Sequence, residues 1–190
     1  MSKNECFTIN SDKDLGSNYN YAHHLQLEIP TEAQFPKSMY SVKNLRTLIF
    51  LLYQSHYDLS NLFQHFRYLR ALTLNCGNTL LKEPLNAVGN FIHLRNLSLV
   101  KYSKDRLHET ICNLCNLQSL KITINSDKFK ELTEGMRKLI NLRHFILDSK
   151  FGLNVKFPKG FGRLISLRTI SHFNISSGCK LGELKKLNQL

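Results

Sequence analysis

A six-residue frame, leucine-arginine-any-leucine-any-leucine or a close variant, recurs along the chain and constrains its fold more than any other feature. The copies cover residues 45–50, 69–74, 94–99, 117–122, 142–147 and 167–172. Their first positions are separated by 24, 25, 23, 25 and 25 residues, a period at which repeated units stack into a solenoid. We therefore expect an extended surface suited to binding rather than a built-in pocket for chemistry.

The frame and the segment before it predict one strand and one short helix per repeat. Strand side chains alternate between two faces, so the fourth and sixth frame positions face the core and the third and fifth face outward. A second apolar rhythm of spacing three, as in Met136, Leu139 and Leu142, is that of a tight helical turn. Pattern and period together are those of leucine-rich repeats. We predict an α/β leucine-rich-repeat solenoid, right-handed, with a parallel β-sheet on its concave face and short helices or 3-10 turns on the other side.

The frames also predict the strands and the core by residue. A degraded copy at residues 22–27, which begins 23 residues before Leu45, supplies one further strand. The predicted strands lie near 25–27, 46–49, 70–73, 95–98, 118–121, 143–146 and 168–171. The predicted core includes Leu48, Leu72, Leu74, Leu97, Leu99, Leu120, Leu142, Leu147 and Leu164.

The ninth repeat position departs from the usual pattern. It is often Asn or Cys in such proteins, but here it is Gly77, Tyr102, Asn125, Lys150 and Ile175 in successive repeats. Only Asn125 could join a side-chain ladder to loop backbone, so we expect an uneven curvature.

The periodicity suggests two segments. Residues 1–20 show little repetition, and we expect an N-terminal arm or at most a cap strand. Residues 21–190 form the predicted repeat domain of about seven repeats. Leu190 follows Leu167 by 23 residues, so the array stops inside its own period. We expect it to be truncated at the C-terminus, with an open core that favours self-association.

Composition indicates the cellular compartment of the protein and the charge of its partner. The chain has 26 basic and 14 acidic side chains, a net charge of +12, which implies an acidic partner. Its five cysteines show no disulfide framework, and the first residues lack the apolar stretch of a secretion signal. No apolar run approaches the ~18 residues of a membrane span. We expect a cytoplasmic protein without a membrane span.

Arginine occupies the second frame position in five of six copies, with Gln118 in the other. Neighbouring strands lie ~4.8 Å apart, so these arginines form a track about 24 Å long. The track is either an inherited feature of the repeat, in which the arginine stems cover apolar surface, or a docking strip for carboxylates or phosphates.

The outward-facing residues of the middle frames are small and polar. They are as consistent with ordinary solvated surface as with a binding site. The candidate protein-binding residues are Arg46, Arg70, Arg95, Arg143, Arg168, Asn96, Ser98, Ser119, Lys121 and His144.

The sequence gives little support for a metal site or a catalytic site. The pair Cys112 and Cys115 has zinc-ligand spacing, but zinc needs two further ligands, and His108 alone is not enough. We expect both thiols to be buried against the short helix. No nucleophile, base or paired carboxylates have positional support, so we expect no enzyme activity, metal or cofactor.

Several segments resemble plant intracellular immune receptors, which carry a coiled-coil domain, a nucleotide-binding domain and leucine-rich repeats. The likeness covers roughly residues 20–190. The segment at 157–169, Phe-Pro-Lys-Gly-Phe-Gly-Arg-Leu-Ile-Ser-Leu-Arg-Thr, is typical of the group. So is Cys-Lys-Leu-Gly-Glu-Leu-Lys-Lys-Leu-Asn at 179–188, and residues 62–72 and 132–144 look like further repeats of the family.

The resemblance implies two roles for such repeats in plant defence. The first repeats would fold back on an acidic nucleotide-binding domain and restrain it, and later repeats would recognise a pathogen effector or a guarded host protein. The Gly-Lys-Ser/Thr loop that wraps phosphates does not occur here, so we expect a repeat-domain fragment or shortened relative that cannot hydrolyse ATP alone.

Three other functions compete with this one. A leucine-rich-repeat adaptor outside immunity, such as a ubiquitin-ligase substrate receptor, would normally carry a docking motif near its start, and residues 1–20 show none. A basic nucleic-acid-binding surface would interleave aromatic side chains with its cations on one exposed face. The sequence does not predict such a face, and it contains no known nucleic-acid-binding module. A secreted receptor ectodomain would carry a signal sequence and cysteine caps.

Overall fold

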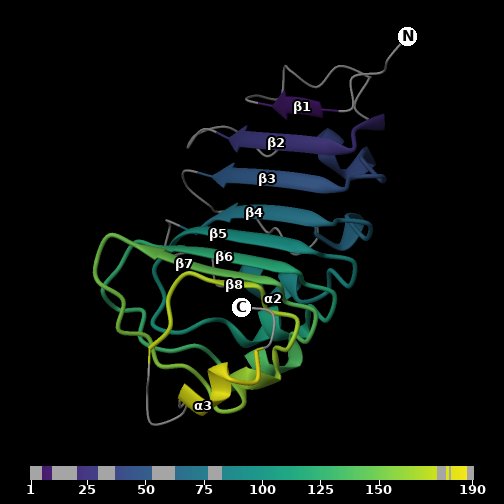
Figure 1. The fold of residues 1–190 in the computed structure, drawn as a ribbon. Coiled ribbons are helices and arrows are strands. Elements are labelled where there is room, and N and C mark those ends of the chain that lie inside the picture. The colour runs from purple at the N-terminus through teal and green to yellow at the C-terminus, as the bar shows by residue number, and fades with distance from the viewer. Residues whose placement is uncertain are drawn as a thin grey trace.

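The computed structural model describes residues 6–9, 21–29, 37–52, 63–76, 83–174, 179 and 181–187. Within them a parallel sheet runs in strict chain order from β1 to β8 (Figure 1). Its strands are β1 Cys6–Ile9, β2 His24–Ile29, β3 Thr47–Leu52, β4 Ala71–Asn75, β5 Asn96–Tyr102, β6 Ser119–Ile124, β7 His144–Ser149 and β8 Thr169–Ile170. Each strand pairs with the next copy of the repeat, so the predicted leucine-rich-repeat solenoid is confirmed.

Short helices fill the limbs between strands, on the side of the molecule away from the sheet (Figure 1). They are the 3-10 helices η3 Lys37–Ser41, η4 Glu109–Asn113, η5 Glu134–Lys138 and η6 Phe161–Arg163, with the α-helices α2 Glu83–Val88 and α3 Leu181–Leu184. The three-residue apolar spacing predicted this mixture, since 3-10 helices have three residues per turn. None of these helices is long and apolar enough to cross a membrane.

The core lies between the sheet and these helices. All nine predicted core leucines are buried, and the most accessible of them, Leu147, is only 4% exposed. In β4 the burial alternates residue by residue: Leu72 and Leu74 point inward, and Ala71, Thr73 and Asn75 are half-buried on the other face. The alternation follows from the period-two geometry of strands.

Most of the strands begin one residue later than the sequence predicts, at the third frame position instead of the second. The reason is a shared acceptor. The carbonyl of Arg70 accepts from the N–H of Arg95 at 2.8 Å and from the N–H of Asn96 at 3.0 Å, and the same pairing recurs at every repeat. The second frame residue therefore belongs to the turn that leads into the strand.

The last strand is shorter than predicted because a side chain replaces its ladder. The hydroxyl of Ser171 accepts from the N–H of Leu147 and donates to the carbonyl of Leu147, both at 2.8 Å. These contacts satisfy the main-chain groups that a longer β8 would have paired. The strand consequently ends at Ile170.

At the ninth repeat position, Tyr102 makes the side-chain link for which the sequence had offered Asn125. Asn125 is exposed, and its main-chain N–H donates to the carbonyl of Tyr102 at 3.0 Å. The link from side chain to loop is made by Tyr102, which is 1% exposed and whose hydroxyl donates to the carbonyl of Arg106 at 2.8 Å. The side chain of tyrosine is longer than that of asparagine, so the Tyr102 hydroxyl reaches the loop carbonyl from deeper in the core.

At the N-terminal end, β1 pairs in register with β2, and Cys6 lies opposite His24. A strand was the most that the sequence predicted for residues 1–20. The rest of that segment, residues 1–5 and 10–20, lies outside the described residues, as do Leu190 at the other end of the chain and Gly77 and Ile175 at the ninth position.

Candidate protein-binding edge

The repeated turn that leads into each strand sets the geometry of the site. The residues after the 3-10 helices η4, η5 and η6 have nearly the same backbone angles: Leu114 (φ −78°, ψ 68°), Leu139 (−80°, 55°) and Leu164 (−78°, 55°). These are the angles of an inverse γ-turn. Each leucine points into the core, so the two residues that follow it point outward before the frame begins. We call the row of these turns, together with the second frame position, the entry edge.

Asparagine side chains tie the turns of the entry edge together. Asn116 donates from its amide to the carbonyl of Ile92 in the preceding turn, and Asn141 donates to the carbonyl of Cys115, both at 2.8 Å. Both asparagines stand immediately before the first leucine of a frame. Sequence reasoning looked for an asparagine ladder at position nine and missed this one, although Asn44, Asn116 and Asn141 share the place.

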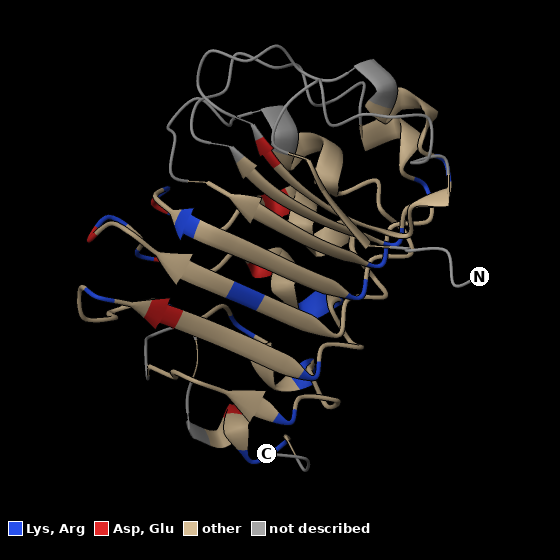
Figure 2. Ribbon diagram, turned by 90° about the horizontal axis from the view of Figure 1, so that it is seen from above, with Lys and Arg blue, Asp and Glu red and all other residues tan. Residues whose placement is uncertain are grey.

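The arginine column, which comprises Arg46, Arg70, Arg95, Arg143 and Arg168, lies along this edge, and all five residues are exposed. Figure 2 shows blue Lys or Arg segments at the ends from which several strands start, the place that the second frame position occupies. Main-chain bonds hold successive members one strand apart, as in Arg95 N–H to Arg70 carbonyl at 2.8 Å and Arg168 N–H to Arg143 carbonyl at 2.7 Å. In the described part of the chain, none of the five pairs with a carboxylate. The column is therefore available to an external anion.

A polar groove of about 680 Å³ follows the first half of the column. It is lined by His23, Asn44, Arg46, Tyr68, Arg70, His93, Arg95, Asn116, Gln118 and Asn141. Three guanidinium groups and two imidazoles thus face one channel, which favours anionic ligands. Gln118 separates these three arginines from the last two, so the structure divides the column into a group of three and a pair.

Two aromatic rings on the groove escaped the sequence analysis. Tyr68 is 59% exposed, and its ring stacks on that of His93 with centroids 6.4 Å apart and planes 16° from parallel. Both residues stand immediately before the first leucine of a frame, a position that the outward-facing positions three and five do not include. Comparing that position across repeats would have found them.

The remaining candidate residues form a second, neighbouring patch on the open face of the sheet. Strand register places Asn96 beside Ser119 and Ser119 beside His144, while Ser98 lies beside Lys121. Asn96, Lys121 and His144 are exposed, and Ser98 and Ser119 are half-buried. The ring of His144 also lies 3.2 Å from the hydroxyl of Thr169, measured from Nδ1 to Oγ1. The structure thus brings the five predicted residues together in two rows on β5–β7.

Comparison with known proteins agrees with this architecture. A family model described as "Leucine-rich repeat region" matches residues 44–190, more than half of the chain. The chain belongs to this leucine-rich-repeat family.

It is also similar to the Arabidopsis thaliana protein named "Putative disease resistance protein At1g59780", with 28% identity over 149 residues. That match covers 77% of this chain and 16% of the relative, so the chain spans about a sixth of the relative's length. The predicted resemblance to the repeat region of a plant resistance protein is confirmed.

A solved structure shows the same fold. The leucine-rich-repeat protein LIC12759 of Leptospira interrogans superposes with a TM-score of 0.71 over 96% of this chain and 45% of that chain. Sequence identity is 21%, so this likeness concerns the fold alone.

The cysteines of this repeat region correct one prediction. Cys112 is buried on η4, as expected, but Cys115 is exposed because it follows the γ-turn residue Leu114. Burial, helped by the nearby carboxylate of Glu109, raises the pKa of the Cys112 thiol to about 12. The two thiols therefore differ in reactivity and point to different surroundings. Among the described residues, no three His, Cys, Asp or Glu side chains are grouped so that they could hold a metal ion.

Proposed function

We propose that this leucine-rich-repeat region is a protein-interaction module of a plant disease-resistance receptor. In this role its arginine column binds an acidic surface of the receptor's nucleotide-binding domain and restrains it. The name of the Arabidopsis relative and the family match support this setting. The proposal places the chain in the cytoplasm and assigns it binding without catalysis.

The observation that carries the proposal is the arginine column beside the polar groove. Arginine forms bidentate hydrogen bonds to carboxylates, and its charge attracts an acidic partner over about a Debye length. Exposed arginines one strand apart also repel one another weakly in the free protein. A partner that supplies carboxylates to the first three members, Arg46, Arg70 and Arg95, removes this repulsion and gains the paired bonds.

The test reverses charge on the column in an intact receptor. Arg46→Glu combined with Arg70→Glu replaces attraction by repulsion and should weaken contact with the nucleotide-binding domain by about 1–3 kcal/mol. We expect signalling without a pathogen and weaker binding of the separated domain. Added salt should weaken the wild-type contact in the same sense.

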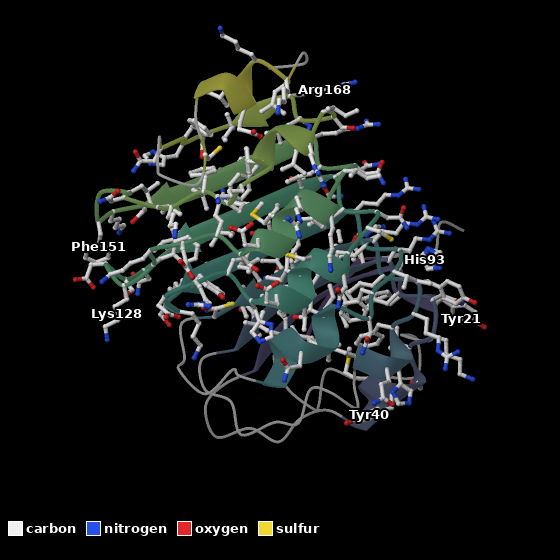
Figure 3. The ribbon with its side chains drawn as sticks, turned by 90° about the horizontal axis from the view of Figure 1, so that it is seen from below. Tyr21, Tyr40, His93, Lys128, Phe151 and Arg168 are labelled. Atoms are coloured by element: carbon white, nitrogen blue, oxygen red, sulfur yellow. The ribbon has the colours of Figure 1, made fainter. Side chains whose placement is uncertain are left out.

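The matched control is Lys128→Glu combined with Lys150→Glu, which makes the same change in charge at two exposed positions away from the entry edge. Figure 3 shows Lys128 on the opposite side of the molecule from His93. This control should leave restraint intact. If a correctly folded Arg46/Arg70 double variant stays silent and binds the domain normally, the column does not restrain the switch.

Effector recognition is the second candidate, and the observation that favours it is the polar patch on β5–β7. Small side chains such as Ser98 and Ser119 leave main chain and neighbouring polar groups accessible to a partner. Lys121→Glu with His144→Glu should abolish effector-dependent signalling without causing signalling in its absence. Signalling that persists unchanged in this variant would remove the patch from consideration, and preferred binding of nucleic acid or a ubiquitin ligase would favour the competing functions.

A further inference from the structure

A row of exposed apolar side chains runs along the entry edge beside the arginine column. It contains the first residue after the buried turn residue in four successive repeats, the buried residues being Phe91, Leu114, Leu139 and Leu164. We call it the apolar edge row, and its members are Ile92, Cys115, Ile140 and Ile165. The three isoleucines are 59%, 56% and 63% exposed. Isoleucine is among the residue types most often buried. Three exposed isoleucines in one row therefore indicate a surface that a partner covers.

The fold holds these side chains outward and in line. The buried residue before each member of the row, as in Leu114, is followed by the next core residue three positions later, so two residues lie between them. The intervening residues are therefore directed away from the core. Hydrogen bonds from Asn116 and Asn141 to the main-chain carbonyls of Ile92 and Cys115 fix the second and third turns of the row against the ones before them. The row is therefore preorganised, and a partner would meet no cost of ordering it.

The charge along the same edge specifies what the row accepts. In the six complete frames, the two turn residues and the second frame residue include seven cations and no acid. The cations are Lys43, Arg46, Arg67, Arg70, Arg95, Arg143 and Arg168. In the first two repeats the place of the isoleucines is taken by Lys43 and Arg67. The edge is thus basic at one end and both basic and apolar at the other.

Spacing indicates the conformation of the partner. Consecutive members of the row belong to repeats that are one strand spacing apart, ~4.8 Å. An α-helix advances ~5.4 Å per turn and can present one apolar side chain on each turn. Same-face residues of an extended strand lie ~6.7 Å apart, so they fall out of step with the row after two repeats. The three steps from Ile92 to Ile165 correspond to about ten residues of helix at ~1.5 Å each.

We propose that the apolar edge row is the docking site of an acidic amphipathic helix that lies across the repeats. One aliphatic side chain per helical turn would rest on the isoleucines, and flanking glutamates or aspartates would meet Arg95, Arg143 and Arg168. The inference rests on the proposed role of this chain in binding proteins, but not on restraint of a nucleotide-binding domain.

The experiment uses the full 190-residue chain and two fluorescein-labelled peptides of 18 residues as probes. One peptide carries leucine at every third or fourth position with glutamates between them. The other has alanine in place of each leucine, which keeps charge and helix propensity. Fluorescence anisotropy should give a dissociation constant at least about tenfold lower for the leucine peptide. Circular dichroism should show added helix on binding.

The matched variant is Ile92→Ser with Ile140→Ser and Ile165→Ser, which should bring the leucine peptide down to the affinity of the alanine peptide. All three positions are exposed, so the variant should fold, and its melting temperature verifies this. Phe151→Ser is the control: Phe151 is 47% exposed and lies on the opposite side of the molecule from His93 (Figure 3). It should bind like the wild type.

Cys115 provides a readout inside the row itself. It is exposed, whereas Cys76, Cys112 and Cys179 are buried. Alkylation of Cys115 by iodoacetamide, followed by mass spectrometry, should slow in proportion to the fraction of chain that holds the leucine peptide. Cys6 on β1 is also exposed and serves as the internal reference, because it should react at an unchanged rate.

Four other results would overturn the inference. Equal binding of the two peptides, or full binding by the isoleucine variant, would show that charge alone attracts the peptide. Phosphatidylserine vesicles that bind the wild type and not the variant, with no peptide binding, would assign the row to a membrane. A dimer in sedimentation that the variant abolishes would assign it to a second copy of this chain. Failure of the Arg46/Arg70 test alone would remove the restraint and leave the row standing.

Discussion

At the scale of the residue, Lys101 has a left-handed backbone with φ of 56°, the one such non-glycine position among the described residues. Left-handed backbone costs a residue with a Cβ roughly 1–2 kcal/mol relative to the right-handed form. Lys101 sits where the register between β5 and β6 shifts, between Leu99 and Tyr102. The bulge inserts an extra residue, and Tyr102 then faces the core. Burial of the Tyr102 ring and its bond to Arg106 offset the strain.

Replacing Lys101 with glycine should therefore stabilise the protein, by up to about 1 kcal/mol, because glycine adopts this conformation without a Cβ clash. The matched substitution is Lys121→Gly, at another exposed lysine within a strand of the sheet. That change should destabilise by about 0.5–1 kcal/mol, since glycine weakens an ordinary strand. Urea unfolding of the two variants measures both, and the same sign in both would refute the explanation.

At the scale of the element, the docking of α3 on η6 depends on one glycine and one carboxylate. The N–H of Gly162 donates to Oε2 of Glu183 at 2.9 Å. A Cβ on Gly162 would lie 2.6 Å from the main-chain oxygen of Glu183 and 2.7 Å from Oε2, closer than real contacts allow. The contact joins the limb of the last complete frame to the short helix that follows it.

Gly162→Ala should push α3 off η6 and lower the free energy of unfolding by about 1–3 kcal/mol, as overpacking does. Gly152→Ala is the control, because no atom lies within 4 Å of the Cβ position there. The midpoint of urea unfolding should fall for the first variant only. Equal midpoints would mean that α3 adds little to stability.

The same contact gives a pH dependence. The hydrogen bond from Gly162, with help from Lys186, lowers the pKa of the Glu183 carboxyl below its usual value. A group with a lowered folded pKa stabilises above its unfolded pKa of ~4.3, and the contribution disappears as pH falls through the folded value. Between about pH 6 and pH 3, the wild type should thus lose more stability than Glu183→Gln. Thermal melts across this range test it, and parallel curves would contradict it.

The repeat frame predicted the elements well, and local contacts explain where it failed. Strands and core leucines follow from apolar spacing, which the sequence shows directly. The early end of β8 depends on the Ser171 hydroxyl bonding to Leu147, 24 residues away in sequence. The role of Tyr102 depends on a bulge that no glycine marks. Such contacts join residues that a pattern search compares only when it aligns every position of the repeat.

At the scale of the whole molecule, the arrangement is one-dimensional. Every strand pairs only with its neighbours in sequence, from β1 to β8. The limbs repeat this order, since η4 contacts α2 and η5, and η5 contacts η6. Stability in such an array is approximately a sum of repeat terms and nearest-neighbour interfaces. The entry edge has the same regularity, so the sequence could predict the arginine column, whereas the exposed isoleucines and the groove needed the turn geometry.

This one-dimensional order predicts which strands a core substitution destabilises. Leu97 is 2% exposed and lies in register between Leu72 on β4 and Leu120 on β6. Leu97→Ala should cost about 2–5 kcal/mol by leaving a cavity at the centre of the sheet. Because neighbours alone feel that cavity directly, amide hydrogen exchange should quicken in β4–β6 more than in β2 or β7. Exchange followed by mass spectrometry resolves the strands. Equal acceleration in all of them would show that the array opens as one cooperative unit, and then a partner bound at the entry edge would stabilise every repeat alike.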